Sequence, residues 1–176
     1  GAGYIGSHVA KQLLEQDRDI IVIDNLSTGF QSTIDTLHKI KKFDFINLDL
    51  NDFEKVGEVF EKYNIETLIH FAAFSQVGES MQNPMKYYMN NTVNTTHLVK
   101  CASIYGVKKF IFSSTAATYG EPTLKGREQT ITEEFDTKPI NPYGKSKLMS
   151  EQVIKDEEKV NKYFKYCIFR YFNVAG

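Results

Sequence analysis

The stretch that decides the fold is GAGYIGSHVAKQLLEQDRDIIVID, residues 1–24. Residues 1–6 match the pattern G-x-G-x-x-G, and apolar side chains then recur at the spacing of an amphipathic helix through residues 5–14. Residues 19–23 are a short apolar run typical of a buried strand, which ends on Asp24. This order of glycine turn, helix, strand and terminal acid predicts the start of a dinucleotide-binding α/β fold.

Asp24 and the glycine turn have complementary roles in such a fold. The glycines let the backbone approach a pyrophosphate, which then lies at the N-terminus of the helix. Asp24 follows Gly6 by 18 residues, where the fold places the carboxylate that binds the adenosine ribose hydroxyls. Because a carboxylate repels a 2′-phosphate, we expect the cofactor to be NAD rather than NADP.

The composition narrows the class of partner. The 176 residues carry 21 basic and 22 acidic side chains, a balance that argues against nucleic acid or an anionic membrane as the main partner. No apolar run is long enough to cross a bilayer. Cys101 and Cys167 lie in apolar stretches of the sequence and are interpreted as buried thiols in a reducing compartment rather than as a disulfide, and no Cys/His cluster has metal-ligand spacing. We therefore expect a cytoplasmic protein without a metal site.

Strand and helix patterns alternate along the rest of the chain. Further strands are expected at residues 43–48, 67–73, 108–112 and 166–171, and helices at 32–41, 53–63, 83–105 and 142–160. Residues 124–138 are expected to be irregular. Such alternation predicts an α/β fold with a doubly wound parallel sheet. We expect residues 1–176 to form one Rossmann-like NAD-binding domain, with its site at the carboxyl edge of the sheet.

Tyr143 and Lys147 stand four residues apart in the segment 141–147, where Pro142 suits the first position of a helix. On a helix the phenol and the ammonium share one face, one turn apart. A cation about 4 Å away, at an effective dielectric of about 20, supplies about 4 kcal/mol. That is enough to lower a tyrosine pKa from about 10 to about 7. The pair can therefore form a tyrosinate general base; the alternative is a helix start with a solvated lysine.

Several other positions have two interpretations each. Asp49 can accept a hydrogen bond from an adenine amino group, or it can cap the helix that follows. The hydroxyl-rich segment Ser113–Thr118 can line a site at a strand end, or form an ordinary turn. His70 lies within an apolar strand and is interpreted as a core histidine rather than a catalyst. Asn90, Asn91 and Asn94 are poor helix formers inside an expected helix, which suggests that some of them have a task.

Taken in order, these motifs resemble the extended short-chain dehydrogenase/reductases, and within them the nucleotide-sugar epimerases. The segments that carry the resemblance are Gly1–His8, Asp24–Leu26, His70–Ala73, Val77–Ser80, Tyr87–Asn91, Ser113–Ala117, Asn141–Lys147 and Arg170–Asn173. They span the chain in the family's order. The resemblance implies the same doubly wound fold, NAD as the cofactor and a UDP-sugar as the small-molecule substrate.

The resemblance also implies a role for each matching residue. The implied cofactor-binding residues are Gly1, Gly3, Tyr4, Ile5 and Gly6 at the pyrophosphate, Asp24, Asn25, Leu26, Ser27, Thr28 and Gly29 at the adenosine ribose, Asp49 and Leu50 at the adenine, Phe71, Ala72, Ala73, Ser75 and Asn90 along the central part, and Lys147 and Phe172 at the nicotinamide riboside. Tyr143, Lys147 and Thr115 form the implied catalytic set. Thr115, Tyr143 and Asn173 are expected to contact the sugar nucleotide.

Two residues depart from the family's pattern. Ser75 stands where many of these epimerases have lysine, so one contact to a cofactor phosphate is expected to be missing; Thr115 replaces a serine but keeps the hydroxyl. The first strand and the C-terminal substrate domain are also expected to lie outside residues 1–176. A buried central strand contributes on the order of 10 kcal/mol, about the whole stability of a domain. We therefore expect this chain by itself to be poorly stable and inactive.

The implied activity is epimerisation at C4 of a UDP-hexose, UDP-glucose or UDP-galactose, through a 4-keto intermediate. One alternative is a nucleotide-sugar 4,6-dehydratase, but that reaction needs acidic groups beside Thr115, where this chain has Ala116 and Ala117. A UDP-N-acetylhexosamine 4-epimerase and a non-catalytic NAD-binding module are further alternatives. A homodimer through the helices expected at 84–105 and 142–160 is typical of the family.

Overall fold

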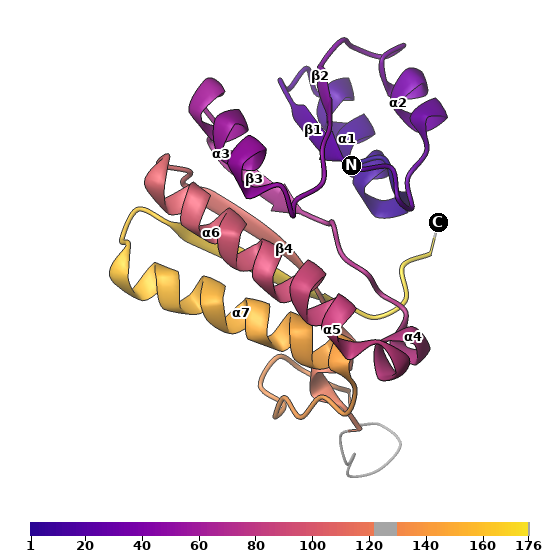
Figure 1. Cartoon of the computed structure of the whole chain (residues 1–176), viewed down its shortest axis with the longest axis vertical. Coiled ribbons are helices and arrows are strands. Elements are labelled where there is room, and N and C mark those ends of the chain that lie inside the picture. The colour runs from indigo at the N-terminus through magenta and orange to yellow at the C-terminus, as the bar shows by residue number, and fades with distance from the viewer. Residues whose placement is uncertain (122–129, 176) are drawn as a thin grey trace. The chain divides into compact units, whose positions relative to one another are not determined.

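The computed structural model describes residues 1–121 and 130–175, in which helices and strands alternate (Figure 1). The strands are β1 (Ile21–Asp24), β2 (Asp44–Asn47), β3 (Thr67–His70), β4 (Lys109–Thr115) and β5 (Lys165–Tyr171). The α-helices are α1 (Tyr4–Glu15), α2 (Gln31–Leu37), α3 (Phe53–Lys62), α4 (Val77–Gln82), α5 (Pro84–Tyr87), α6 (Asn94–Ile104) and α7 (Pro142–Val160). A π-helix, η1 (Tyr88–Val93), joins α5 to α6, and a 3₁₀-helix, η2 (Ala116–Tyr119), follows β4.

Residues 124–129 of the segment expected to be irregular lie outside the described residues. Between residues 130 and 140 the chain forms neither helix nor strand, in agreement with the prediction for that part. None of the helices in the described part of the chain is long and apolar enough to cross a membrane.

Residues Gly1–Lys62 form one compact unit around a two-stranded parallel sheet. β1 pairs with β2 in register, from Ile21 opposite Asp44 to Asp24 opposite Asn47. A core cluster of this unit consists of the buried residues Ala2, Ala10, Leu14, Val22, Ile34 and Leu37. This cluster packs α1 and α2 against the sheet, and it keeps Asp24 at the end of β1 as the sequence predicts.

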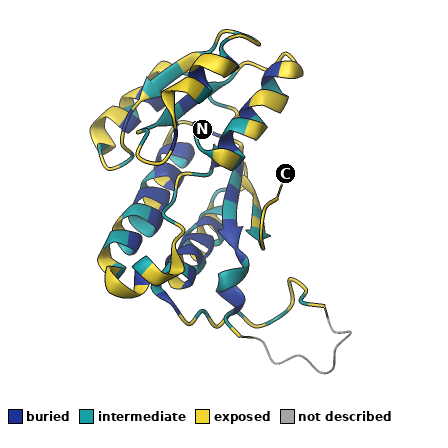
Figure 2. Ribbon diagram, turned by 90° about the vertical axis from the view of Figure 1, so that its right-hand side faces the viewer, coloured by how far each residue is buried: buried dark blue, intermediate teal, exposed yellow. Residues whose placement is uncertain are grey.

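Residues Tyr63–Gly176 form the second unit, around a parallel sheet of order β3-β4-β5. Helices α6 and α7 lie side by side on one face of this sheet (Figure 1). Alternate side chains of β4 point toward them, because Phe110, Phe112 and Ser114 are buried. Figure 2 shows buried and exposed residues on opposite sides of the long helices, as expected for helices that cover a sheet.

The α/β class and the parallel strands agree with the prediction, but the strands form two sheets instead of one. In a doubly wound fold the first strand lies between the second and the fourth and pairs with both. Residues 1–176 begin at the glycine turn, and each unit has its own sheet. Our expectation of one domain over residues 1–176 stays a prediction.

The helix expected over residues 83–105 is interrupted in the structure. A separate short helix, α4, precedes it, and the π-helical turn η1 separates α5 from α6. Such turns occur frequently at functional sites. Here the wider turn contains Asn90 and Asn91, the residues whose poor helix propensity suggested a task, and Asn91 is buried.

Candidate active site

Helix α7 begins at Pro142, where the sequence predicts a helix start. The Asn141 side chain accepts a hydrogen bond from the Gly144 N–H at 2.8 Å, and Pro142 lies at the start of the first turn. This cap satisfies one of the backbone donors that a helix start leaves unpaired. Tyr143 and Lys147 therefore stand one turn apart on α7. The alternative of a solvated lysine is wrong, because Lys147 is only 3% exposed.

Gly144 lets the first turn of α7 approach η2, which follows β4, closely. A Cβ atom at this position would lie 2.5 Å from the Ala117 carbonyl oxygen and 3.0 Å from the Pro139 Cβ. The neighbouring Tyr143 reaches Thr115, and their side chains form a hydrogen bond. The Thr115 hydroxyl accepts the Ala117 N–H at 3.1 Å, which leaves its own proton for the tyrosine oxygen. Ser113–Thr118 is therefore both a turn and the place where a hydroxyl meets Tyr143.

The pKa of Tyr143 differs from our expectation. Burial raises this pKa above its ordinary value, and the hydrogen bond with Thr115 opposes the rise only in part. We expected the charge of Lys147 to lower it. Without cofactor or substrate, the surroundings of Tyr143 therefore keep its phenol protonated, because burial disfavours the charged form of a phenol.

Lys147 is also affected by burial, which lowers its pKa to about 7 against the opposing effect of the Glu151 carboxylate. Its ammonium nitrogen lies 4.5 Å from the centroid of the Phe112 ring, a cation–π contact between α7 and β4. A lysine with this pKa is charged only part of the time at neutral pH. The electric field at the phenol is consequently weaker than a full positive charge would produce.

A buried carboxylate, Glu151, lies one turn further along α7. It accepts hydrogen bonds from Ser114 Oγ at 2.5 Å and from Arg170 Nε and Nη2 at 3.0 and 2.7 Å. The guanidinium carbon of Arg170 also lies 4.8 Å from the centroid of the Tyr119 ring. These contacts join α7 to the ends of β4 and β5. The sequence analysis missed Glu151, although its spacing of four residues from Lys147 was the available signal.

Asn91 fixes the chain that follows β3. Its side chain accepts the Phe74 N–H and donates to the Phe74 carbonyl, both at 3.0 Å, and it donates to Ser146 Oγ of α7 at 3.1 Å. Asn90 donates to Asn91 Oδ1 at 3.0 Å. The loop 71–75, which the resemblance connects with the cofactor, is thereby held to η1 and α7. Asn91 therefore has a structural role in holding this loop, and Asn90 contributes one hydrogen bond to it.

His70 is a core histidine, as we interpreted it. Its Nε2 lies 3.0 Å from Thr95 Oγ1, and the Thr95 hydroxyl donates to the Asn91 carbonyl at 2.6 Å. Because the hydroxyl has one proton, His70 must be the donor, which defines its neutral tautomer. Burial, with a smaller effect of Lys147, lowers the His70 pKa to about 3, so the ring stays neutral.

In the first unit, Asp24 holds the glycine turn. Its Oδ2 accepts hydrogen bonds from the nitrogens of Gly1 and Ala2, both at 2.8 Å, and Oδ1 accepts the Leu26 N–H at 2.9 Å. Burial would raise the Asp24 pKa, but the hydrogen bonds from Gly1, Ala2 and Leu26, together with the positive charge of the Gly1 amino group, outweigh it and hold the pKa below its ordinary value. A carboxylate has about four acceptor positions, so this anion can hold the turn and still accept ribose hydroxyls.

The loop after β1 lies directly against the glycine turn. A Cβ atom on Gly29 would lie 2.7 Å from the Ala2 Cβ and 2.9 Å from its carbonyl carbon, so the approach requires glycine. Leu26 has a φ of 57°, a conformation that costs a non-glycine residue about 1–3 kcal/mol and clusters at ligand sites. The residues that the resemblance connects with the adenosine ribose and the pyrophosphate are thus held together in this unit.

Asp49 is not a helix cap, so that alternative is wrong. Asp52 has this role for α3, because it accepts the Lys55 N–H at 3.3 Å. The Asp49 carboxylate instead accepts the side-chain N–H groups of Asn51 at 2.6 Å and Asn25 at 2.7 Å. Asp49 is thereby linked to the ribose segment through Asn25, while its contact with adenine stays a prediction.

The site residues fall into two sets, one in each unit. The set in the first unit suits NAD, because it combines a glycine turn before α1 with an ionised carboxylate that has free acceptor positions. Phe172 and Asn173 follow β5 and are exposed, so their roles stay predictions. Among residues 1–121 and 130–175, no group of three His, Cys, Asp or Glu could hold a metal ion.

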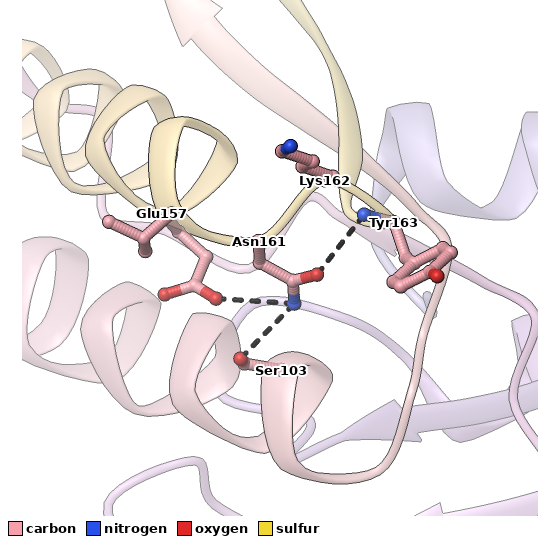
Figure 3. Close-up of a pocket in the computed structure, with 6 residues that line it drawn as sticks. Ser103, Glu157, Asn161, Lys162 and Tyr163 are labelled. Carbon is pink, nitrogen blue, oxygen red and sulfur yellow. Dashed lines mark hydrogen bonds between the residues drawn. The ribbon is translucent and has the colours of Figure 1, made fainter.

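A hollow at the opposite ends of α6 and α7 is separate from these sets (Figure 3). Its lining residues are Ser103, Glu157, Val160, Asn161, Lys162 and Tyr163. Asn161 spans it, with hydrogen bonds to Ser103 at 3.3 Å and Glu157 at 3.4 Å. The hollow lies at the last turn of α7, whereas Tyr143 lies at the first turn. The hollow is therefore not the catalytic centre.

Fold and site together define a class: an α/β dinucleotide-binding protein in which a Tyr-x-x-x-Lys helix packs a phenol against a threonine hydroxyl. The model of the NAD dependent epimerase/dehydratase family matches residues 1–176. The chain belongs to this family, whose cofactor is NAD.

Known relatives of the chain are nucleotide-sugar 4-epimerases. It is 42% identical over its whole length to UDP-glucose 4-epimerase uge1 of Schizosaccharomyces pombe, of which it covers 50%. It is 44% identical to UDP-arabinose 4-epimerase 1 of Arabidopsis thaliana, again over the whole chain and 42% of that protein. Among solved structures, the UDP-Glc/GlcNAc 4-epimerase of Campylobacter jejuni matches 99% of the chain with a TM-score of 0.95 and 53% identity, and the chain covers 52% of it. The chain thus spans about half the length of these relatives.

Proposed function

We propose that this chain is the NAD-binding part of an enzyme that inverts C4 of a UDP-hexose, UDP-glucose or UDP-galactose, through a 4-keto intermediate. The observation that carries the proposal is the hydrogen-bonded pair of Tyr143 and Thr115, with buried Lys147 one turn along α7. Binding of NAD alone would not require a phenol paired with a threonine hydroxyl one turn from a buried lysine. A non-catalytic module is therefore disfavoured.

The chain's own residues handle the proton in this proposal. When bound, NAD accepts the C4 hydride and returns it. The Tyr143 oxygen takes the proton of the 4-hydroxyl as a general base. Thr115 has a single proton, which turns from the Tyr143 oxygen to the substrate oxygen that becomes the ketone. The same two groups act in reverse when the proton returns, so no external acid is needed.

Lys147 supplies the charge that a tyrosinate needs. Burial disfavours the charged forms of both Tyr143 and Lys147 when each is considered alone. The same burial strengthens the attraction between them once both are charged, since the effective dielectric is low. A proton leaving Tyr143 therefore raises the pKa of Lys147, and a charged Lys147 lowers that of Tyr143.

The 4,6-dehydratase alternative requires an acid beside Thr115 that this chain does not have there. Ala116 and Ala117 begin η2, and neither side chain can protonate a leaving group. For the substrate we propose a UDP-hexose. The names of the Arabidopsis and Campylobacter relatives, which mention arabinose and GlcNAc, make the corresponding UDP-sugars the second candidates.

The test uses the complete protein that contains this chain, with UDP-glucose as substrate and product analysis by NMR. We expect UDP-galactose without a keto-deoxy product. Tyr143→Phe should lower kcat by about 10²–10⁴-fold, the contribution of a general base, while NAD stays bound. Tyr163→Phe, which removes a phenol that is 86% exposed at the other end of α7, is the matched control and should keep full activity. Near-normal turnover of Tyr143→Phe would contradict the proposal.

We also propose that the complete protein is cytoplasmic and dimerises through the helices of residues 84–105 and 142–160. Met85, Met89 and Met149 are exposed on these helices, which supports an apolar contact. Equilibrium sedimentation should show a dimer that Met89→Lys with Met149→Lys dissociates. A monomer before substitution would contradict this part.

A further inference from the structure

A second tyrosine, Tyr87, lies against Tyr143. It comes from the last turn of α5, and its side chain is fully buried. The two ring centroids are 6.3 Å apart with an interplanar angle of 75°. This is the edge-to-face arrangement that aromatic rings prefer. The ring of Tyr143 therefore has a fixed aromatic neighbour in addition to the hydrogen bond at its oxygen.

Tyr87 is itself held by several contacts. Its hydroxyl donates to Glu79 Oε2 at 2.7 Å, and Lys86 donates to Oε1 of the same carboxylate at 2.5 Å. The Phe74 ring packs on it at 6.0 Å, and the Lys86 ammonium lies 4.2 Å from the Phe74 centroid. Glu79, Lys86, Tyr87 and Phe74 thus form a closed cluster, which we call the Tyr87 cluster.

The cluster has no other evident task in the chemistry. Burial and the Glu79 carboxylate raise the Tyr87 pKa to about 12, so its hydroxyl stays protonated and is unsuited to act as a base. Lys86 offsets the charge of Glu79, which would otherwise disfavour a tyrosinate at position 143. What remains is the ring of Tyr87, which limits how the ring of Tyr143 can tilt.

We propose that Tyr87 is a positioning residue for Tyr143: its ring, anchored by Glu79, holds the phenol at the angle from which it reaches the 4-hydroxyl. The inference rests on the proposed function of Tyr143 as a base. Thr115 fixes only the oxygen of Tyr143, and Asn141 fixes only its backbone through the helix cap. A general base must stay within hydrogen-bond reach of the proton that it removes, and the ring contact supplies the missing restraint.

The test compares two substitutions in the complete protein. Tyr87→Leu removes the ring and should lower kcat by about tenfold or more, since misplacement by about 1 Å can cost about 100-fold. KM and bound NAD should change little. Tyr87→Phe keeps the ring and should restore most of the lost kcat. Recovery by phenylalanine would show that the ring, rather than the hydroxyl, is what positions Tyr143.

Phe164→Leu is the matched control for lost packing. Phe164 is fully buried and packs on Phe110 at 5.7 Å, at the start of β5. The Phe164→Leu variant should lower the melting temperature about as much as Tyr87→Leu does, and it should leave kcat unchanged. Equal kcat values in the two leucine variants would overturn the inference, as would a Tyr87→Phe variant as slow as Tyr87→Leu. If Tyr143→Phe itself stays active, the proposed function fails instead.

Discussion

Replacing Gly144 by alanine tests whether close packing of α7 on β4 creates the site. The new methyl group would lie 2.5 Å from the Ala117 carbonyl oxygen and 3.0 Å from its carbonyl carbon. Ordinary contact begins at about 3.4 Å for such atoms. The helix must therefore move by about 1 Å, because the obstacle is backbone that cannot rotate away.

Two opposing effects determine the magnitude. Alanine in a helix is favoured over glycine by about 1 kcal/mol. Overpacking against a rigid neighbour costs about 1–3 kcal/mol. We expect a net loss of stability of up to about 2 kcal/mol from these two terms. The effect on turnover should be larger, about 10- to 100-fold in kcat, since the shift separates Tyr143 from Thr115.

Gly57→Ala in α3 is the matched control, because a Cβ there would meet nothing within 4 Å. It should raise the melting temperature of the complete protein and leave kcat unchanged, whereas Gly144→Ala should lower both. Melting is followed by circular dichroism and kcat by UDP-galactose formation. If Gly144→Ala were stabilised like Gly57→Ala and kept its kcat within about twofold, which is about 0.4 kcal/mol, the packing argument would be refuted.

Three further predictions concern charged side chains. Glu151→Gln should destabilise the complete protein by up to about 3 kcal/mol at pH 7, because it leaves the half-buried Arg170 without its carboxylate. Burial would raise the Glu151 pKa, but Arg170 and Ser114 hold it below the ordinary value. The contribution of Glu151 to stability is therefore present above about pH 4.3 and is lost as pH falls through the pKa of the folded state. The difference in urea midpoint between the variant and the unsubstituted protein should accordingly shrink in acid. Lys147→Met should raise the melting temperature of NAD-free protein at pH 6, because burial lowers the lysine pKa to about 7 and the charged lysine is therefore unfavourable in the folded state. The stability of the unsubstituted protein should accordingly rise between about pH 7 and about pH 10. The same rise in the variant would contradict this prediction. Asp24→Asn should weaken NAD binding by about tenfold or more, measured by calorimetry, because a charged acceptor is lost, and unchanged affinity would argue against its ribose contact.

Local signals in the sequence were sufficient for the elements and for much of the site. The glycine turn, Asp24 at the end of β1 and the helix start at Pro142 depend on neighbouring residues, and the structure has them where they were predicted. The same holds for His70 as a core residue. Hydrophobic periodicity, turn residues and helix-start signals each involve only a few neighbouring residues. They can therefore be recognised in the sequence without knowledge of the tertiary structure.

Features that depend on contacts between distant segments were not predictable. The sequence spacing of Tyr143 and Lys147 suggested a lowered tyrosine pKa, but burial in the folded chain raises it. Glu151 with Arg170, Asn91 with Phe74, and Tyr87 with Tyr143 are pairs from different elements.

The sequence by itself therefore determined the class of fold, the cofactor type and the identity of the phenol and lysine, because these follow from local pattern and motif. Tertiary structure decided the charge states of Tyr143 and Lys147 and the neighbours that orient them. The physical reason is that desolvation and packing depend on what surrounds a side chain in space, and packing of α7 on β4 brings together residues such as Thr115 and Tyr143 that lie far apart along the chain.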